Sequence, residues 1–164
     1  MIGVPAIRIL GIDPGTRRLG FGVIEKKGTR LTALAYGVID VSGIEPFSAR
    51  LADIHAELGR VISEFKPVEA AIEQVFYWRN ARTAIRAAEG RGAVLLTLAL
   101  AGLKVHEYAP AVIKRAATGR GGADKTQVVR MVQTLLSLKT PPSKDAADAL
   151  AAAIAHLHRR GGAR

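Results

Sequence analysis

The stretch ILGIDPGTRRLGFGVI, residues 9–24, contains two apolar segments separated by a short polar turn. Pro14-Gly15 marks this turn, and Lys27-Gly28 marks a second turn shortly after it. The two turns delimit three predicted strands: 6–12 (AIRILGI), 20–26 (GFGVIEK) and 31–40 (LTALAYGVID). Because connections this short join antiparallel neighbours, this part of the chain predicts two successive antiparallel hairpins.

Beyond residue 40, helical and strand patterns alternate. Apolar residues recur at helical spacing over 48–65, and the apolar segment VEAAIE, 68–73, predicts a buried strand. An Ala-rich helix over 80–101 and a strand over 103–108 follow. A strand, helix, strand order favours parallel pairing with right-handed crossovers. We therefore expect an α/β fold whose five-stranded mixed sheet has three antiparallel strands, then two parallel strands, and is flanked by helices.

The last third of the chain is predicted to form three helices, over 109–117, 124–138 and 143–158. Pro110 suits the first turn of the first helix, and Ser143 suits the N-cap of the last. The middle helix is expected to bury one apolar side made of Val128, Met131, Val132, Leu135 and Leu136. We expect a single domain over 1–158 and a flexible basic tail, RRGGAR, over 159–164.

The charge balance points to a polyanionic partner. The chain has 24 Lys and Arg against 14 Asp and Glu, a formal charge of +10 and a pI of about 10.5. No basic amphipathic helix with an aromatic apolar face is apparent, so nucleic acid fits better than a membrane surface. The absence of cysteine excludes disulfides and sulfur-ligated zinc. The longest apolar run, 93–102, is too short for a bilayer span, and we expect a cytoplasmic protein.

Four carboxylates are candidates for one metal site. Asp13 and Glu73 each end a predicted strand, and parallel strands would bring them to one edge of the sheet. Asp145 and Asp148 are three residues apart and share a face of the last helix. Four acids with no adjacent arginine could bind Mg²⁺ or Mn²⁺, which prefer oxygen ligands. Two such ions together can activate a water molecule for hydrolysis of a phosphodiester. In the alternative reading, Asp13 caps its own turn and the helix pair interacts with the helix dipole.

The histidines are not predicted to join this site. His55 and His106 are expected to be packed or exposed, and His156 and His158 lie about three turns beyond Asp145. The segment GRGGADKT, 119–126, is similar to a phosphate-binding P-loop, but it has Asp124 where glycine is needed and follows a helix, so nucleotide binding is rejected.

Basic and aromatic residues suggest contacts with nucleic acid. The loop around 119–126 carries cations suited to gripping phosphates, namely Lys114, Arg115, Arg120 and Lys125. Arg79, Arg82 and Arg86 form a basic stripe at helical spacing. Either group of cations could equally well form an ordinary solvent-exposed surface without a binding role. Phe76, Tyr77 and Trp78 are consecutive, so they cannot all point inward, and at least one is expected to be exposed for stacking on bases or wedging between them.

Four segments in this order resemble the RuvC family of bacterial Holliday-junction resolvases, within the ribonuclease H-like superfamily: ILGIDPGTRRLGFGVI, AIEQVF, VIKRAATGRGGADKTQV and DAADALAAAIAH. The similarity extends over about residues 5–158. IDPGT alone also occurs in actin-like and hexokinase-like ATPases, but those folds need two such halves and a far longer chain. The run Tyr77-Trp78-Arg79 departs from the family, whose members differ there.

The resemblance implies a ribonuclease H-like fold and an endonuclease that resolves four-way DNA junctions in recombination and repair. It implies that Asp13, Glu73, Asp145 and Asp148 are the catalytic, metal-binding acids. It further implies that Phe76 probes the bases of the junction, and the residues proposed to contact DNA are Phe76, Tyr77, Arg79, Lys114, Arg120 and Lys125. A homodimer with helix 80–101 near its two-fold axis is implied, as is a branch-migration helicase partner of the RuvA and RuvB type.

Two alternatives remain at the level of sequence. One is a non-catalytic junction-binding protein of the same fold, although it would have no need of all four acids. The other is a ribonuclease H-like nuclease that acts on other branched or RNA-containing substrates. For the resolvase we expect symmetric nicking of two strands of like polarity, with 5′-phosphate and 3′-hydroxyl products.

Overall fold

The structure is a computed structural model that describes residues 5–75 and 80–162. Its centre is one mixed sheet in the order β3-β2-β1-β4-β5. The strands are β1 (Ile7–Asp13), β2 (Arg18–Lys27), β3 (Arg30–Asp40), β4 (Glu69–Glu73) and β5 (Lys104–Tyr108). The β1–β2 and β2–β3 pairs are antiparallel, whereas β1–β4 and β4–β5 are parallel. The expected five-stranded mixed sheet is therefore confirmed.

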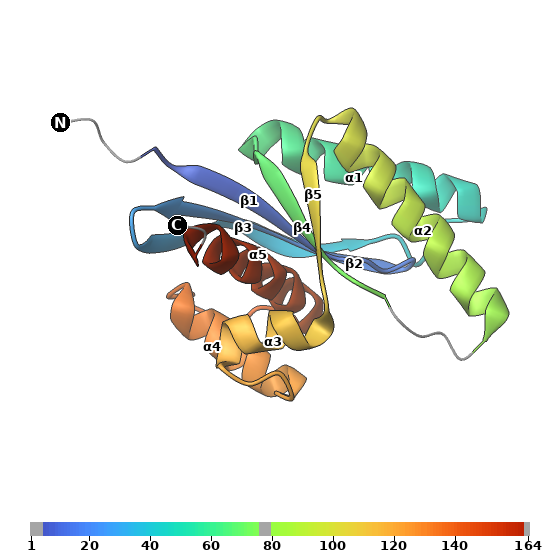
Figure 1. The fold of residues 1–164 in the computed structure, drawn as a ribbon. Coiled ribbons are helices and arrows are strands. Elements are labelled where there is room, and N and C mark those ends of the chain that lie inside the picture. The colour runs from blue at the N-terminus through green and yellow to red at the C-terminus, as the bar shows by residue number, and fades with distance from the viewer. Residues whose placement is uncertain (1–4, 76–79, 163–164) are drawn as a thin grey trace.

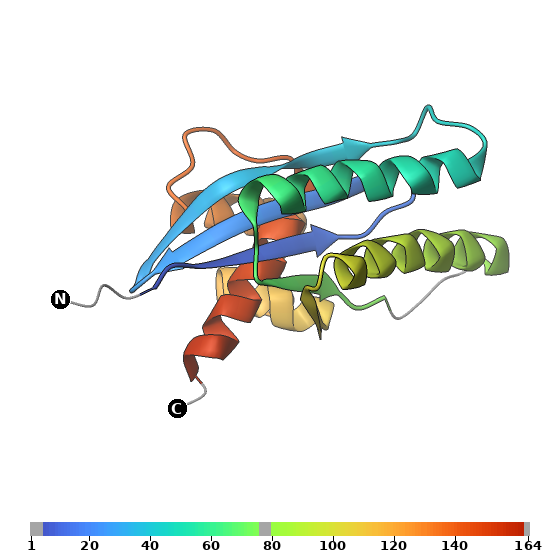
Figure 2. The same ribbon diagram turned by 90° about the horizontal axis from the view of Figure 1, so that it is seen from above.

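Helices cover both faces of the sheet, as Figure 1 and the orthogonal view of Figure 2 show. They are α1 (Phe47–Phe65), α2 (Ala81–Leu100), α3 (Pro110–Thr118), α4 (Lys125–Leu135) and α5 (Lys144–Gly162). The pair α1 and α2 covers one face, and α3, α4 and α5 cover the other. Successive strand residues serve opposite faces: Ile9 packs in the α5 layer and Leu10 in the α1 layer.

Helix α5 lies unusually close to the sheet because small residues line both surfaces. Its alanines between 146 and 155 are at most 1% exposed. A Cβ atom placed on Gly11 of β1 would lie 1.9 Å from the carbonyl oxygen of Ala149. A Cβ atom on Gly20 of β2 would lie 2.1 Å from the carbonyl oxygen of Asp145. Backbone contacts of this kind fix the height and the rotation of α5 over β1 and β2.

The sequence misplaced parts of the C-terminal helices. Helix α4 ends at Leu135, and Ser137 adopts a left-handed φ of 51°. The helix buries Val128 and Val132, but Met131 and Leu135 are 37% and 39% exposed, so the predicted apolar side is too wide. Helix α5 continues to Gly162, so residues 159–162 extend the helix and do not begin a loose tail.

No helix in the described part of the chain is both long and apolar enough to cross a bilayer.

Candidate active site

Two strand ends and one helix bring the four predicted acids together. Strands β1 and β4 are parallel neighbours, with Ile12 opposite Ile72, so Asp13 and Glu73 follow side by side at the carboxyl edge. A Cβ atom on Gly20 would touch both the backbone of Asp145 and, at 3.2 Å, the Cβ atom of Asp13. The close docking of α5 thus places its first turns, with Asp145 and Asp148, over the same strand ends.

Burial and repulsion between neighbouring acids raise the proton affinity of Asp13 and Glu73. The pKa of Asp13 is raised from 3.8 to about 7, first by burial and then by the negative charges of Asp148 and Glu73. The pKa of Glu73 is also raised, by burial and then by Asp148, while Lys125 and Lys114 oppose the shift. Carboxylates that repel one another in a half-buried site are well suited to hold a divalent cation, because the positive charge of the cation removes the repulsion.

Two cations hold the helical acids in place. The Lys125 Nζ atom lies 3.1 Å from Asp148 Oδ2, and this hydrogen bond raises the pKa of Lys125. The Arg18 Nε atom lies 3.0 Å from Asp145 Oδ2, and its Nη1 atom lies 3.2 Å from Asp40 Oδ2. The expectation that no arginine adjoins the acids was therefore wrong. The sequence offered one hint, because the turn after Asp13 returns the chain at Arg18, the first residue of β2.

The predicted cations beyond the acids lie around α3 and α4. Lys114 lies on α3 near enough to lower the pKa of Glu73, and Arg120 is exposed in the turn that follows α3. Asp124 is the N-cap of α4, where its side chain accepts a hydrogen bond from the amide of Gln127. This capping role explains the aspartate that breaks the P-loop pattern.

The predicted aromatic contacts, Phe76, Tyr77 and Trp78, together with Arg79, lie outside the residues that the structure describes.

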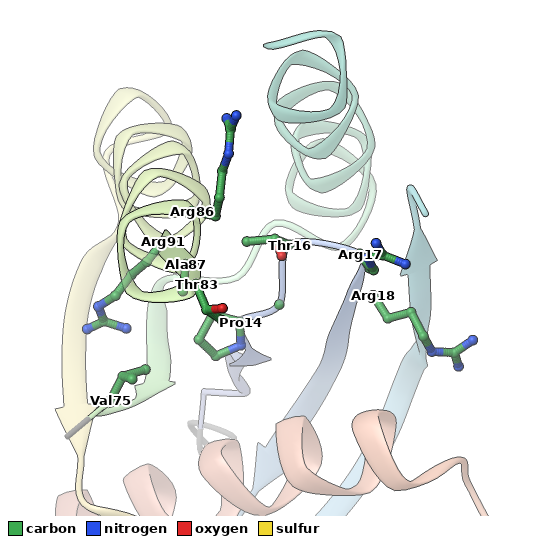
Figure 3. A pocket seen from close by; sticks show the side chains of 10 residues that line it. Pro14, Thr16, Arg17, Arg18, Val75, Thr83, Arg86, Ala87 and Arg91 are labelled. Atoms are coloured by element: carbon green, nitrogen blue, oxygen red, sulfur yellow. The ribbon is translucent and has the colours of Figure 1, made fainter. Parts of the chain in front are cut away.

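A basic pocket of about 340 Å³ opens directly after Asp13. It is lined by the β1–β2 turn, Val75 and helix α2, through Pro14, Gly15, Thr16, Arg17, Arg18, Val75, Thr83, Arg86, Ala87 and Arg91. Figure 3 shows Arg91 turned toward Val75 and Arg86 extending away from Pro14. Arg91 donates to the carbonyl oxygen of Glu73 at 3.1 Å and pairs with Glu107 at 2.8 Å. A concave cationic surface next to acidic ligands suits a phosphodiester backbone.

Comparisons with known proteins agree with this chemistry. The family described as "Crossover junction endodeoxyribonuclease RuvC" matches residues 9–156. Proteins of that name from Sorangium cellulosum and Rhodopseudomonas palustris are 47% identical over 155 residues and 48% identical over 157 residues. The alignments cover 94% of this chain and 87% of the first relative, and 96% of this chain and 90% of the second.

The fold is also similar to that of a solved structure. T. thermophilus RuvC in complex with a Holliday junction substrate superposes with a TM-score of 0.88 at 37% identity. The superposition covers 95% of this chain and 96% of that one.

Proposed function

The chain belongs to the RuvC family of crossover junction endodeoxyribonucleases, and from this premise we propose that it resolves four-way DNA junctions by symmetric, metal-dependent nicking. Two strands of like polarity are cut, leaving 5′-phosphate and 3′-hydroxyl ends that a ligase seals. The observation that carries the proposal is the convergence of Asp13, Glu73, Asp145 and Asp148 beside a basic pocket. The likeness to T. thermophilus RuvC bound to a Holliday junction supports the choice of substrate.

The four acids would hold Mg²⁺ or Mn²⁺, with two ions in each site. Asp13 would anchor both ions, Glu73 and Asp148 would complete their coordination, and Asp145 would bind one ion or orient the attacking water. Bound ions of this kind activate a water molecule and stabilise the departing oxygen of the phosphodiester.

The chain's own residues prepare this site. Arg18 and Lys125 fix the orientations of Asp145 and Asp148 through their hydrogen bonds. Because its pKa is raised to about 7, Asp13 exists in both protonated and ionised forms near neutral pH, and metal binding would favour the ionised form.

Phosphate contacts around the acids would supply most of the affinity for DNA. Lys114 and Lys125 lie near the acids on the α3 and α4 side, Arg120 is exposed in the turn after α3, and the basic pocket with Arg17 and Arg86 lies on the α2 side. Contacts of this kind dominate affinity, whereas stacking is worth about 1–3 kcal/mol per base. Phe76, Tyr77 and Arg79 would contact the junction itself, so that Phe76→Ala impairs cutting more than binding.

A homodimer would place two equivalent sites on one junction. Ile85, Leu96 and Leu100 of α2 are 61%, 59% and 70% exposed. Their separations of 11 and 4 residues put them on one helical face, and a self-complementary apolar stripe suits an isologous two-fold contact. We further propose that the enzyme works in the cytoplasm with a branch-migration helicase of the RuvA and RuvB type.

The decisive experiment is single-turnover incubation with an end-labelled synthetic four-way junction, with and without Mg²⁺ or Mn²⁺. Linear duplex and RNA–DNA hybrid serve as substrate controls. We expect paired, ligatable nicks on the junction only when metal is present. Cutting of the hybrid would assign the chain to another ribonuclease H-like activity, and tight binding without cutting under either metal would indicate a binding protein.

Variants connect this activity to the proposed site. Asp13→Asn should abolish nicking and leave junction binding largely intact, because the phosphate contacts are made elsewhere. Asp53→Asn is the matched control, since Asp53 lies on α1 on the other face of the sheet. Normal cutting by Asp13→Asn would refute the site assignment.

A further inference from the structure

A second group of metal-ligating atoms lies at the far end of β4 from the acids. Within residues 5–75 and 80–162, Glu69, His106 and His156 form the one group of three such side chains whose ligand atoms all lie within 4.8 Å of one another. The Nε2 atom of His156 lies 2.5 Å from Glu69 Oε2, and that of His106 lies 3.5 Å from the same oxygen. Glu69 and Glu73 are four positions apart on an extended strand, which corresponds to about 13 Å, so this cluster and the acids are separate sites.

Neighbouring side chains orient the ligand atoms toward one another. The Nδ1 atom of His156 is hydrogen-bonded to the hydroxyl of Tyr108 at 2.6 Å, so its Nε2 atom is directed at Glu69. Arg160 donates to Glu69 Oε1, which leaves Oε2 facing the two imidazoles. His156 and Glu69 thus each have a second hydrogen bond to a group outside the cluster, which is the arrangement that positions histidine and carboxylate ligands in metal proteins.

One nitrogen in the cluster lacks a partner. Among the described residues, the Nε2 atom of His106 is the one buried side-chain nitrogen or oxygen without a hydrogen bond. A buried polar atom without a partner is destabilising, so each such group in a native protein calls for an explanation, of which a bound ion is one. Burial, followed by the neighbouring charge of His156, lowers the pKa of His106 and favours the neutral imidazole that binds metals.

We propose that Glu69, His106 and His156 bind one Zn²⁺-like transition-metal ion, with water as a fourth ligand. Two imidazoles and a carboxylate suit zinc and its neighbours, whereas magnesium prefers oxygen ligands only. Tetrahedral bonds of about 2.1 Å place ligand atoms roughly 3.4 Å apart. The His106 to Glu69 separation of 3.5 Å already matches, and the hydrogen-bonded pair Glu69 and His156 must open by about 1 Å. The ion would tie α5 to β4 and β5.

The proposal is tested by calorimetric titration of Zn²⁺ alone into chelator-treated full-length protein in excess Mg²⁺. We expect one Zn²⁺ per chain, both in the native sequence and in Asp13→Asn, whose catalytic site is altered. His106→Ala and the milder His106→Asn should weaken binding by more than about tenfold, with circular dichroism as the check on folding. His158→Ala is the matched control, because His158 is an exposed histidine of α5, the helix that carries His156.

A second readout uses Co²⁺, whose visible absorption reports nitrogen ligands and low coordination number. The bands should appear in the native protein and in His158→Ala, and be lost in the His106 variants. Absence of Zn²⁺ binding would overturn the proposal and leave the cluster as a hydrogen-bonded link between α5 and the sheet. Binding that survives both His106 variants, or that Mg²⁺ displaces, would equally overturn it.

Discussion

Removal of the Asp13 carboxylate should stabilise the protein while abolishing its chemistry. In the unfolded chain this carboxyl ionises near 3.8, whereas in the folded chain burial and the neighbouring acids raise its pKa to about 7. Between these values the folded state keeps a proton that the unfolded state has lost. The contribution of Asp13 to the free energy of unfolding therefore falls as the pH rises from about 4 to about 7, and it levels off above that range. Asn at this position carries no such penalty.

The magnitude follows from the same pKa values. At about 1.4 kcal/mol per pKa unit, the difference between 3.8 and about 7 gives an upper limit of about 4 kcal/mol. Glu73, whose pKa is also raised, can take up a proton when Asp13 ionises, so we expect about half of this limit. For a chain of this length, about 2 kcal/mol corresponds to a rise in Tm of about 4–8 °C.

The assay is thermal unfolding of the native chain, Asp13→Asn and Asp53→Asn in chelator, at pH 5 and pH 8. The increase in Tm of Asp13→Asn over the native chain should be near its maximum at pH 8 and less than half as large at pH 5. Asp53→Asn should show no such pH-dependent increase. Added Mn²⁺ should raise the Tm of the native chain more than that of Asp13→Asn. A lower Tm for Asp13→Asn at pH 8, or a gain independent of pH, would refute the reasoning.

Three further substitutions test the parts that surround the acids. Gly20→Ala should lower the free energy of unfolding by about 3 kcal/mol and reduce cutting, because the new Cβ atom would lie 2.1 Å from a backbone oxygen of α5. Urea unfolding measures this loss. Gly43→Ala is the control and should show no comparable loss, because its Cβ atom would meet no described atom within 4 Å. Lys125→Met should weaken junction binding and reduce the slope of log Kd against log salt by about one, an expectation that an unchanged slope in fluorescence anisotropy titrations would contradict. Asn80→Ala should lower the free energy of unfolding by about 1 kcal/mol, because Asn80 caps α2 by accepting from two backbone amides; an unchanged urea midpoint would show that the cap is dispensable.

Features that depend on neighbouring residues could be predicted from the sequence. The hairpins of β1, β2 and β3 follow from turn signals a few residues long, and the positions of the four acids at strand ends and at the start of a helix could be read from the sequence. Pro110 and Ser143 were correctly assigned to the starts of α3 and α5. In each case the physical cause lies within about one turn or one strand of the residue concerned.

Features that depend on docking could not be predicted. The ion pair between Arg18 and Asp145 joins residues 127 positions apart, and it exists only because α5 lies against β2. His106 was expected to be packed or exposed, and His156 to lie too far from Asp145 to share its site; no sequence spacing indicates that the two histidines meet Glu69. The side of α4 was misjudged because periodicity shows which residues share a face but not how much of that face the neighbours cover.

The contact between α5 and the sheet also constrains how this protein can diverge. At residues 11 and 20, helix backbone occupies the space that any side chain would need, so glycine is the sole residue that fits without moving the acids. Substitutions at these two positions are therefore not neutral. A second substitution elsewhere cannot relieve the clash, because the obstructing atoms belong to the main chain of α5. Exposed residues of α2 and of the α3–α4 turn lie outside this contact, so substitutions there leave the docking of α5 unchanged. In a directed-evolution library confined to those surfaces, most variants should retain the position of α5 and remain active, so that changes in substrate specificity can be detected.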